Sequence, residues 1–103
     1  MIIYNTTFHI EKEIVESCLT YLKEEYIPKA AESGFLHSPR LMRVMNTSED
    51  EGVSFSVQFH VKNVDTLNYW LQKEGAMMHK ALSNRFGQKL AGFSTLLEEI
   101  DLL

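Results

Sequence analysis

Residues 53–62 read Val-Ser-Phe-Ser-Val-Gln-Phe-His-Val-Lys, and apolar and polar residues alternate through this stretch without interruption. A period of two is typical of a β-strand that buries one face, because successive side chains of a strand point to opposite sides. The residues predicted to face a core are Val53, Phe55, Val57, Phe59 and Val61. The opposite face carries Ser54, Ser56, Gln58, His60 and Lys62, so its middle holds small uncharged polar groups in place of the usual Lys and Glu.

Three further segments predict strands. Residues 2–10 alternate, with Tyr4, Phe8 and Ile10 expected on the core face and Asn5, Thr7 and His9 on the other. Residues 35–46 predict an edge strand, because Pro39 has no N–H to donate to a neighbour. The acidic turn at 46–52 should join this strand to the one at 53–62 as a hairpin. Residues 93–100 predict a last strand that is apolar on both faces, at Leu96 and Leu97.

A first helix is expected over residues 13–33. Its apolar stripe has three- and four-residue spacing and consists of Ile14, Cys18, Leu19, Leu22 and Tyr26. Pro28 interrupts the helical hydrogen bonds, so the helix is expected to end or kink near Tyr26. Gly34 should then provide a left-handed stop.

A second helix is expected to begin at Asn63 or Asp65, both good N-caps, and to end at Gly87. Gly75 lies inside it and costs about 1 kcal/mol relative to Ala, which predicts a kink or break. The predicted buried side consists of Leu67, Trp70, Leu71, Met77, Met78, Ala81, Leu82 and Phe86.

The resulting order of strand, helix, strand, strand, helix, strand predicts an α+β fold. Connection rules favour a ferredoxin-like βαββαβ arrangement, with a four-stranded antiparallel sheet and two helices on one face. The strands at 2–10 and 53–62 should form the central pair, with the other two strands at the edges. At this length, residues 1–103 are expected to form one domain.

Five segments are similar to a known family, namely Met1–Thr7, Glu25–Pro28, Ser56–Phe59, Arg85–Gly87 and Phe93–Ile100. Together they resemble the bacterial domain-of-unknown-function family numbered 4286, over nearly the whole chain. This resemblance implies a dimeric α+β barrel, in which two ferredoxin-like sheets pack face to face, and it implies no catalytic residues. Where the family pattern leads us to expect a His before Ile27 and Pro28, the chain has Tyr26.

The composition excludes several classes of protein. A net charge of −4 and dispersed Lys and Arg residues argue against nucleic-acid binding, which needs a basic surface. Cys18 is the only cysteine, so the chain can form neither an internal disulfide nor a Cys-rich zinc site. The first residues lack the features of a signal peptide, and no apolar run reaches membrane-spanning length. A cytoplasmic protein with reduced thiols is expected.

The polar face of the predicted sheet is the main candidate site. Its residues are Asn5, Thr7, His9, Ser54, Ser56, Gln58 and His60. Solvent exposure is one interpretation, since antiparallel sheets tolerate it. The uncharged middle favours a second, an enclosed polar cavity between two copies of the chain, because such groups can be satisfied pairwise or by ordered water. The candidate ligand-binding residues are Asn5, Thr7, Ser54, Ser56, Gln58 and His60.

The histidines predict no metal site. If His9 lies opposite Ser54, His60 is six residues further along its strand, roughly 20 Å away, so one chain cannot use both as ligands. His37 and His79 are interpreted as surface residues. Cys18, on an apolar stripe, is interpreted as an inert buried thiol.

No cofactor is predicted, because no glycine-rich phosphate loop is present. Trp70, Met77 and Met78 are interpreted as core residues at helical spacing and not as a cofactor-stacking patch. The acidic residues Glu49–Glu51 lack the spacing of a calcium loop and are interpreted as a solvated turn.

Three functional hypotheses follow. The favoured one is a homodimeric α+β barrel that binds a small polar or aromatic molecule in a polar cavity between the sheets, or holds no molecule at all, without catalysis. The second is a cofactor-independent oxygenase or isomerase that uses His60 or His9 as a base. The third is an interaction module that presents Glu49–Glu51 and its helices to a protein partner.

Overall fold

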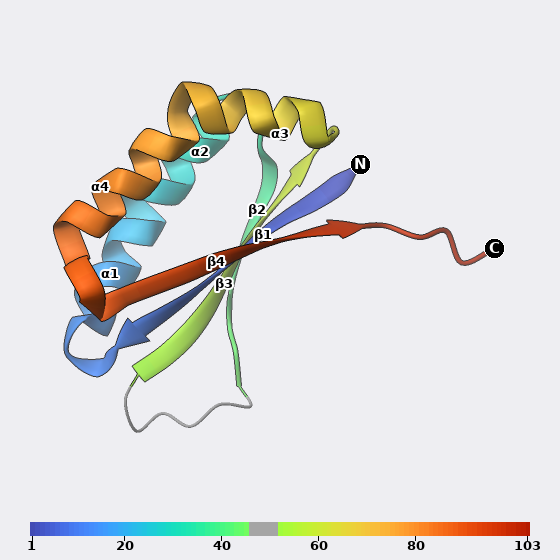
Figure 1. The fold of residues 1–103 in the computed structure, drawn as a ribbon. Helices are drawn as coiled ribbons and strands as arrows, with labels where there is room; N and C mark the ends of the chain where they lie inside the picture. Colours follow the sequence, from blue (N-terminus) through green and yellow to red (C-terminus); the bar gives the residue numbers. More distant parts are fainter. Residues whose placement is uncertain (46–51) are drawn as a thin grey trace.

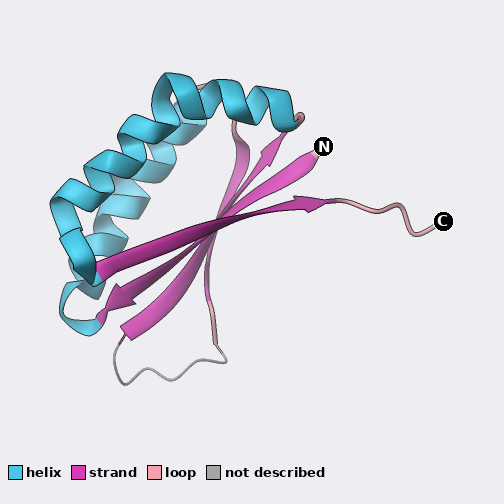
Figure 2. Ribbon diagram, in the orientation of Figure 1, coloured by secondary structure: helices cyan, strands magenta, loops and turns pink. Residues whose placement is uncertain are grey.

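The computed structural model describes residues 1–45 and 52–103. Four strands form one antiparallel sheet in the order β2-β3-β1-β4, and both helical segments cover the same face of it (Figure 1, Figure 2). The strands are β1 (Ile2–Glu11), β2 (His37–Arg43), β3 (Gly52–Val61) and β4 (Leu90–Glu98). The predicted ferredoxin-like order, the central pair and the two edge strands are therefore confirmed.

The register of the central pair follows the alternation of the two strands. Tyr4 lies opposite Phe59 and Phe8 opposite Phe55, on the face that packs under the helices. All four of these aromatic residues are buried, as are Ile10, Val57 and Val61 of the same face. This face forms one side of the core because its side chains are apolar except for Thr6, which lies opposite Val57.

The first helical segment does not end near Tyr26 but runs through Pro28, and an irregular turn lies at the place where the sequence predicted an end or a kink. It consists of a 3-10 turn (Lys12–Ile14), α1 (Val15–Tyr21), a π-helical turn (Leu22–Tyr26) and α2 (Ile27–Glu32). The Ile27 N–H donates to the Leu22 carbonyl, five residues back, and this wider turn lies directly before the proline ring. The interruption that Pro28 imposes is thus absorbed locally, and the helix stops only before Gly34, which has φ 82°.

The second helical segment begins as predicted, because the Asn63 side chain accepts a hydrogen bond from the Thr66 N–H at 2.8 Å. It consists of α3 (Val64–Trp70), a π-helical turn (Leu71–Gly75) and α4 (Ala76–Phe86), and the ribbon bends between α3 and α4 (Figure 1). The predicted irregularity at Gly75 and the stop at Gly87 are confirmed.

Two residues predicted on the buried side of this segment are exposed. Met77 is 72% exposed, and Ala81, one turn further on, is exposed as well. The π-helical turn adds a residue to the turn before them, which shifts the buried stripe of α4 to Met78 and Leu82.

The last strand starts earlier and ends earlier than the predicted range 93–100. It pairs with β1 from Leu90, opposite Ile10, to Glu98, opposite Ile2. Beyond Glu98 the chain leaves the sheet as an extended tail (Figure 1). β2 and β3 pair antiparallel as a hairpin requires, while residues 46–51, with the acidic Glu49–Glu51, lie outside the described residues.

Candidate functional site

The open face of the sheet holds the polar residues predicted from the alternation. Across β1 and β3, Asn5 lies opposite Gln58, Thr7 opposite Ser56, and His9 opposite Ser54. His60 lies opposite Ile3, at the other end of the pair from His9. The candidate residues therefore share one face, and the two histidines stand at opposite ends of it.

Several of these side chains bond to one another. Ser56 Oγ donates to Asn5 Oδ1, and Asn5 Nδ2 donates to Thr7 Oγ1 at 3.3 Å. Nδ1 of His9 lies 3.1 Å from Ser54 Oγ. The centre of the face is thus a hydrogen-bonded polar stripe, as uncharged residues on neighbouring strands permit. Its enclosure by a second copy, and its use as a ligand site, stay predictions.

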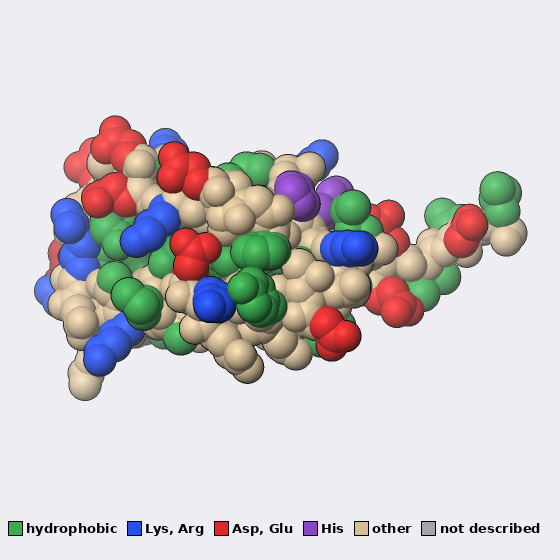
Figure 3. Space-filling model, turned by 90° about the horizontal axis from the view of Figure 1, so that it is seen from above, with side chains coloured by type: hydrophobic (Ala, Val, Ile, Leu, Met, Phe, Trp, Pro, Cys, Tyr) green, Lys and Arg blue, Asp and Glu red, His purple; other side chains and the backbone are tan. Residues whose placement is uncertain are grey.

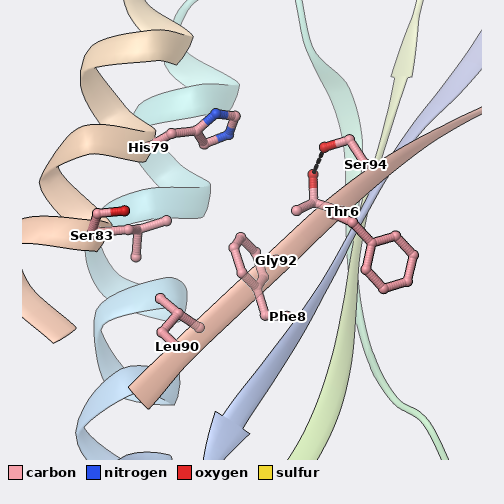
Figure 4. A pocket seen from close by; sticks show the side chains of 9 residues that line it. Thr6, Phe8, His79, Ser83, Leu90, Gly92 and Ser94 are labelled. Atoms are coloured by element: carbon pink, nitrogen blue, oxygen red, sulfur yellow. Dashed lines mark hydrogen bonds between the residues drawn. The ribbon is translucent and has the colours of Figure 1, made fainter. Parts of the chain in front are cut away.

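A pocket of about 240 Å³ lies on the other side of the sheet, between α4 and strands β1 and β4 (Figure 4). It is lined by Thr6, Phe8, His79, Leu82, Ser83, Leu90, Gly92, Phe93 and Ser94. Figure 4 shows His79 reaching from the helix toward the sheet, with Thr6 and Ser94 across from it. Apolar walls and a few polar groups at one end are the usual character of a small-molecule pocket.

The polar end of the pocket is a chain of hydrogen bonds centred on His79. Its Nε2 lies 3.0 Å from the Tyr26 hydroxyl and 3.4 Å from the Tyr4 hydroxyl. The Tyr4 hydroxyl accepts from Ser94 Oγ at 3.4 Å, and Ser94 Oγ lies 3.1 Å from Thr6 Oγ1. The first helix, α4, β1 and β4 all contribute to this chain, so it forms only in the folded molecule.

Burial sets the protonation of these groups. Desolvation lowers the pKa of His79 below its ordinary 6.5, which keeps the imidazole neutral at pH 7. Desolvation, and then the neighbouring Tyr4 and Tyr21, raise the pKa of Tyr26, which stays a neutral hydroxyl. The lining residues include no Lys, Arg, Asp or Glu. The pocket therefore offers uncharged hydrogen-bonding groups beside apolar walls.

The interpretation of His79 as a surface residue is wrong. Its ring stacks on Tyr26 and meets Trp70 edge to face, and the residue is partly buried. The sequence did carry a signal for this position: His79 precedes Leu82 by three residues and Phe86 by seven, which places it beside the apolar stripe of a helix. Thr6 carried a similar signal, since it alternates with Tyr4 and Phe8 on the core face.

Other candidate residues have structural environments. Cys18 is fully buried, and desolvation raises its pKa to about 11, which agrees with an inert thiol. Trp70 and Met78 are buried in the core as interpreted, whereas Met77 is not. Within residues 1–45 and 52–103, no group of three or more His, Cys, Asp or Glu side chains could hold a metal ion. In the same residues, no helix is long and apolar enough to cross a membrane.

Comparisons with known proteins agree on the fold. The family model described as "Domain of unknown function (DUF4286)" matches residues 1–100. No curated protein matches the chain. A solved structure named antibiotic biosynthesis monooxygenase is 15% identical, with a TM-score of 0.70, 98% of this chain covered and 100% of that chain.

Two further solved structures are similar at the same level. An ethyl tert-butyl ether d (ethd) family protein from Bacillus halodurans C-125 is 13% identical, with a TM-score of 0.72 and coverage of 97% and 100%. A dimeric ferredoxin-like protein from an uncultured marine organism is 12% identical, with a TM-score of 0.66 and coverage of 98% and 97%. At these identities the likeness shows the shared ferredoxin-like fold and no more.

Proposed function

Since the chain belongs to the DUF4286 family, whose description assigns no activity, we propose a function from the geometry: a homodimeric α+β barrel protein that binds a small ring compound in the pocket under α4. The observation that carries this proposal is the half-buried, neutral His79 in a pocket lined by both polar and apolar side chains. A cavity of about 150 Å³ holds benzene. A volume of about 240 Å³ therefore has room for one ring with substituents.

The proposed dimer rests on the open face of the sheet. Three large apolar side chains border its polar stripe and are exposed, with Phe93 at 65%, Leu97 at 42% and Met42 at 40%. Their register partners Thr7, Ile3 and Ser56 place them on this face. A two-fold contact that packs this face against its copy would bury all of them and enclose the stripe. The dimeric ferredoxin-like protein of the same fold supports the proposal.

The pocket is tested by blocking it. A set of uncharged fluorinated one-ring aromatics is titrated with the protein, and ¹⁹F line broadening reports binding. Ser83→Phe, an exposed position that lines the pocket, should abolish binding, whereas Asn84→Phe, the next exposed residue and not a lining residue, should not. Equal binding by both variants, or no binding by the unmodified protein, would rule out the pocket as the ligand site.

The dimer is tested by mass in solution. Sedimentation at micromolar concentration should give twice the chain mass of 11.9 kDa. A measured mass equal to that of one chain would rule out both the dimer and the enclosure of the sheet face.

A second candidate is a cofactor-independent oxygenase, favoured by one observation, the structural neighbour named antibiotic biosynthesis monooxygenase. The bases suggested by the sequence are His60 and His9, with an isomerase as the related alternative. Oxygen uptake on addition of 1-naphthol would support an oxygenase, and loss of that uptake in His60→Gln or His9→Gln would identify the base. The interaction-module hypothesis depends on Glu49–Glu51, outside the described residues, and stays a prediction.

A further inference from the structure

The direction of the hydrogen bonds around His79 is fixed by the tyrosines. Tyr26 is 2% exposed, and its hydroxyl has one hydrogen-bond partner among the described residues, Nε2 of His79 at 3.0 Å. A buried O–H that finds no acceptor is strongly disfavoured. The Tyr26 hydroxyl must therefore donate to Nε2, and Nε2 must carry a lone pair and no proton.

The hydrogen bonds of the second tyrosine, Tyr4, support the same assignment. The Tyr4 hydroxyl accepts from Ser94 Oγ, so its own proton is free to be donated. Its other partner in the described chain is again Nε2 of His79, at 3.4 Å. The Thr6–Ser94–Tyr4 chain and Tyr26 thus direct two hydroxyl protons at one nitrogen.

A neutral imidazole carries one proton, and if Nε2 accepts, Nδ1 is the protonated nitrogen. Nδ1 has no hydrogen-bond partner among the described residues. In that same part of the chain, the only fully buried side-chain nitrogen or oxygen without a partner is Trp70 Nε1, so Nδ1 is accessible. His79 is also one of the residues that line the pocket.

We propose that His79 presents this Nδ1–H to the pocket, and that the ligand is an uncharged ring compound bearing a carbonyl oxygen that accepts the hydrogen bond. The inference rests on the proposed binding function and gives it a ligand class. It also assigns His79 the role of donor and not of base, because its one lone pair is already occupied by Tyr26 and Tyr4.

The lining favours an uncharged ligand. No Lys, Arg, Asp or Glu lines the pocket, so no charged side chain there would pair with a carboxylate or an ammonium group. A carbonyl group needs only one good donor, and the apolar side chains of Phe8, Leu82 and Leu90 can cover the ring.

The tautomer can be measured without any ligand. Long-range ¹H–¹⁵N correlation spectra of the full chain at pH 7.5 should show Nδ1 of His79 protonated and Nε2 bare. Tyr26→Phe removes the main donor to Nε2 and should shift the proton toward Nε2. Tyr21→Phe is the matched control, since its hydroxyl makes no contact with His79 among the described residues, and it should leave the tautomer unchanged. A proton found on Nε2 of the unmodified protein would overturn the inference.

The ligand class is tested with two probes of nearly the same shape. 4′-Fluoroacetophenone has a carbonyl oxygen where 4-fluoro-α-methylstyrene has a CH₂ group. The ketone should bind about fivefold more tightly, as one net hydrogen bond provides, and Tyr26→Phe should reduce that ratio. Equal binding of both probes would refute the donor role while leaving the pocket as a ligand site. If neither probe binds, both the pocket as a ligand site and the proposed ligand class are ruled out.

Discussion

His79 owes its chemistry to residues far away in the chain. The two tyrosines that bond to its Nε2 are 53 and 75 residues distant in sequence, and Ser94 reaches the cluster from the last strand. Local periodicity can place a histidine near the edge of an apolar stripe, but it cannot show which side chains approach it from other elements. The residues of the open face were found because the two-residue period assigns faces directly. The pocket residues were missed because the helix–sheet packing assembles them.

The first prediction concerns stability and pH. The pKa of His79 is lowered in the folded protein, so the unfolded chain binds its proton more readily. The stability associated with the neutral imidazole is fully present above about pH 6.5 and should be lost as the pH falls from there through the lower folded-state pKa. Urea denaturation between pH 8 and pH 5 should show this decrease.

Two histidine variants separate the contribution of His79 to this pH dependence from the contributions of the other titrating groups. His79→Gln should be less stable at pH 8, because Tyr26 and Tyr4 lose their acceptor, and should show a weaker decrease toward pH 5. His37→Gln, at an exposed position on β2, is the control and should keep the slope of the unmodified protein. An identical slope in His79→Gln would contradict the assignment.

The second prediction concerns Cys18. It is fully buried and its pKa is raised to about 11, so at pH 8 the reactive thiolate is scarce and shielded. Alkylation by iodoacetamide should therefore be slow in the native protein and rapid in 6 M guanidinium chloride, as followed by mass spectrometry. Rapid modification of the native protein would show that α1 separates from the sheet far more often than its packing suggests.

The helices show which features local sequence preferences predict and which they do not. Gly34 and Gly87 end their helices with positive φ, as glycines after an apolar stripe predict. Gly75 has a different role, because a Cβ built on it would lie 2.6 Å from Trp70 Cζ3 and 2.9 Å from Leu71 Cδ2. The side chain of Trp70 occupies the space that any larger residue would need. The sequence indicated an irregularity at Gly75, but its cause lies in side-chain packing, which propensity does not report.

The third prediction follows from this packing. In an exposed helix, Gly→Ala stabilises by about 1 kcal/mol. Gly75→Ala should instead destabilise the protein by about 1–3 kcal/mol, because the new methyl group overpacks Trp70 and Leu71. Thermal unfolding with calorimetry measures the sign. Asn84→Ala, at an exposed position of α4, is the control and should change stability by less than about 0.5 kcal/mol. A stabilised Gly75→Ala would mean that Trp70 can move aside at little cost.

For the whole molecule, the central question is what covers the second face of the sheet. The helices take one face, and the other combines a self-bonded polar stripe with exposed apolar side chains from β2 and β4. On the surface seen in Figure 3, both acidic and basic side chains are present. The order of strands and helices could be predicted from the sequence, and the rules for connecting them then favoured this fold. The assembly was only suggested by composition, because a monomer with a solvated face obeys the same alternation.

Gln58 provides the sharpest test of the assembly. It lies in the middle of β3 on the open face, opposite Asn5 on one side and Arg40 on the other. Its side-chain amide makes no hydrogen bond within the described residues, so partners or water must come from outside the chain. A buried amide left without a partner costs about 1–3 kcal/mol, whereas a solvated amide costs nothing.

Gln58→Leu should therefore lower stability by about 1–3 kcal/mol if a second copy encloses the face, because the groups that the amide bonds across the interface lose their partner. The midpoint of urea unfolding should depend on protein concentration for the unmodified chain, and less so for a variant that weakens the dimer. Gln72→Leu makes the same chemical change on an exposed helix position and should stay within about 0.5 kcal/mol of the unmodified protein. If Gln58→Leu behaves like Gln72→Leu at both high and low protein concentration, the sheet face is solvated. The homodimeric barrel, and any ligand site between its sheets, would then have to be abandoned, while the pocket under α4 would remain.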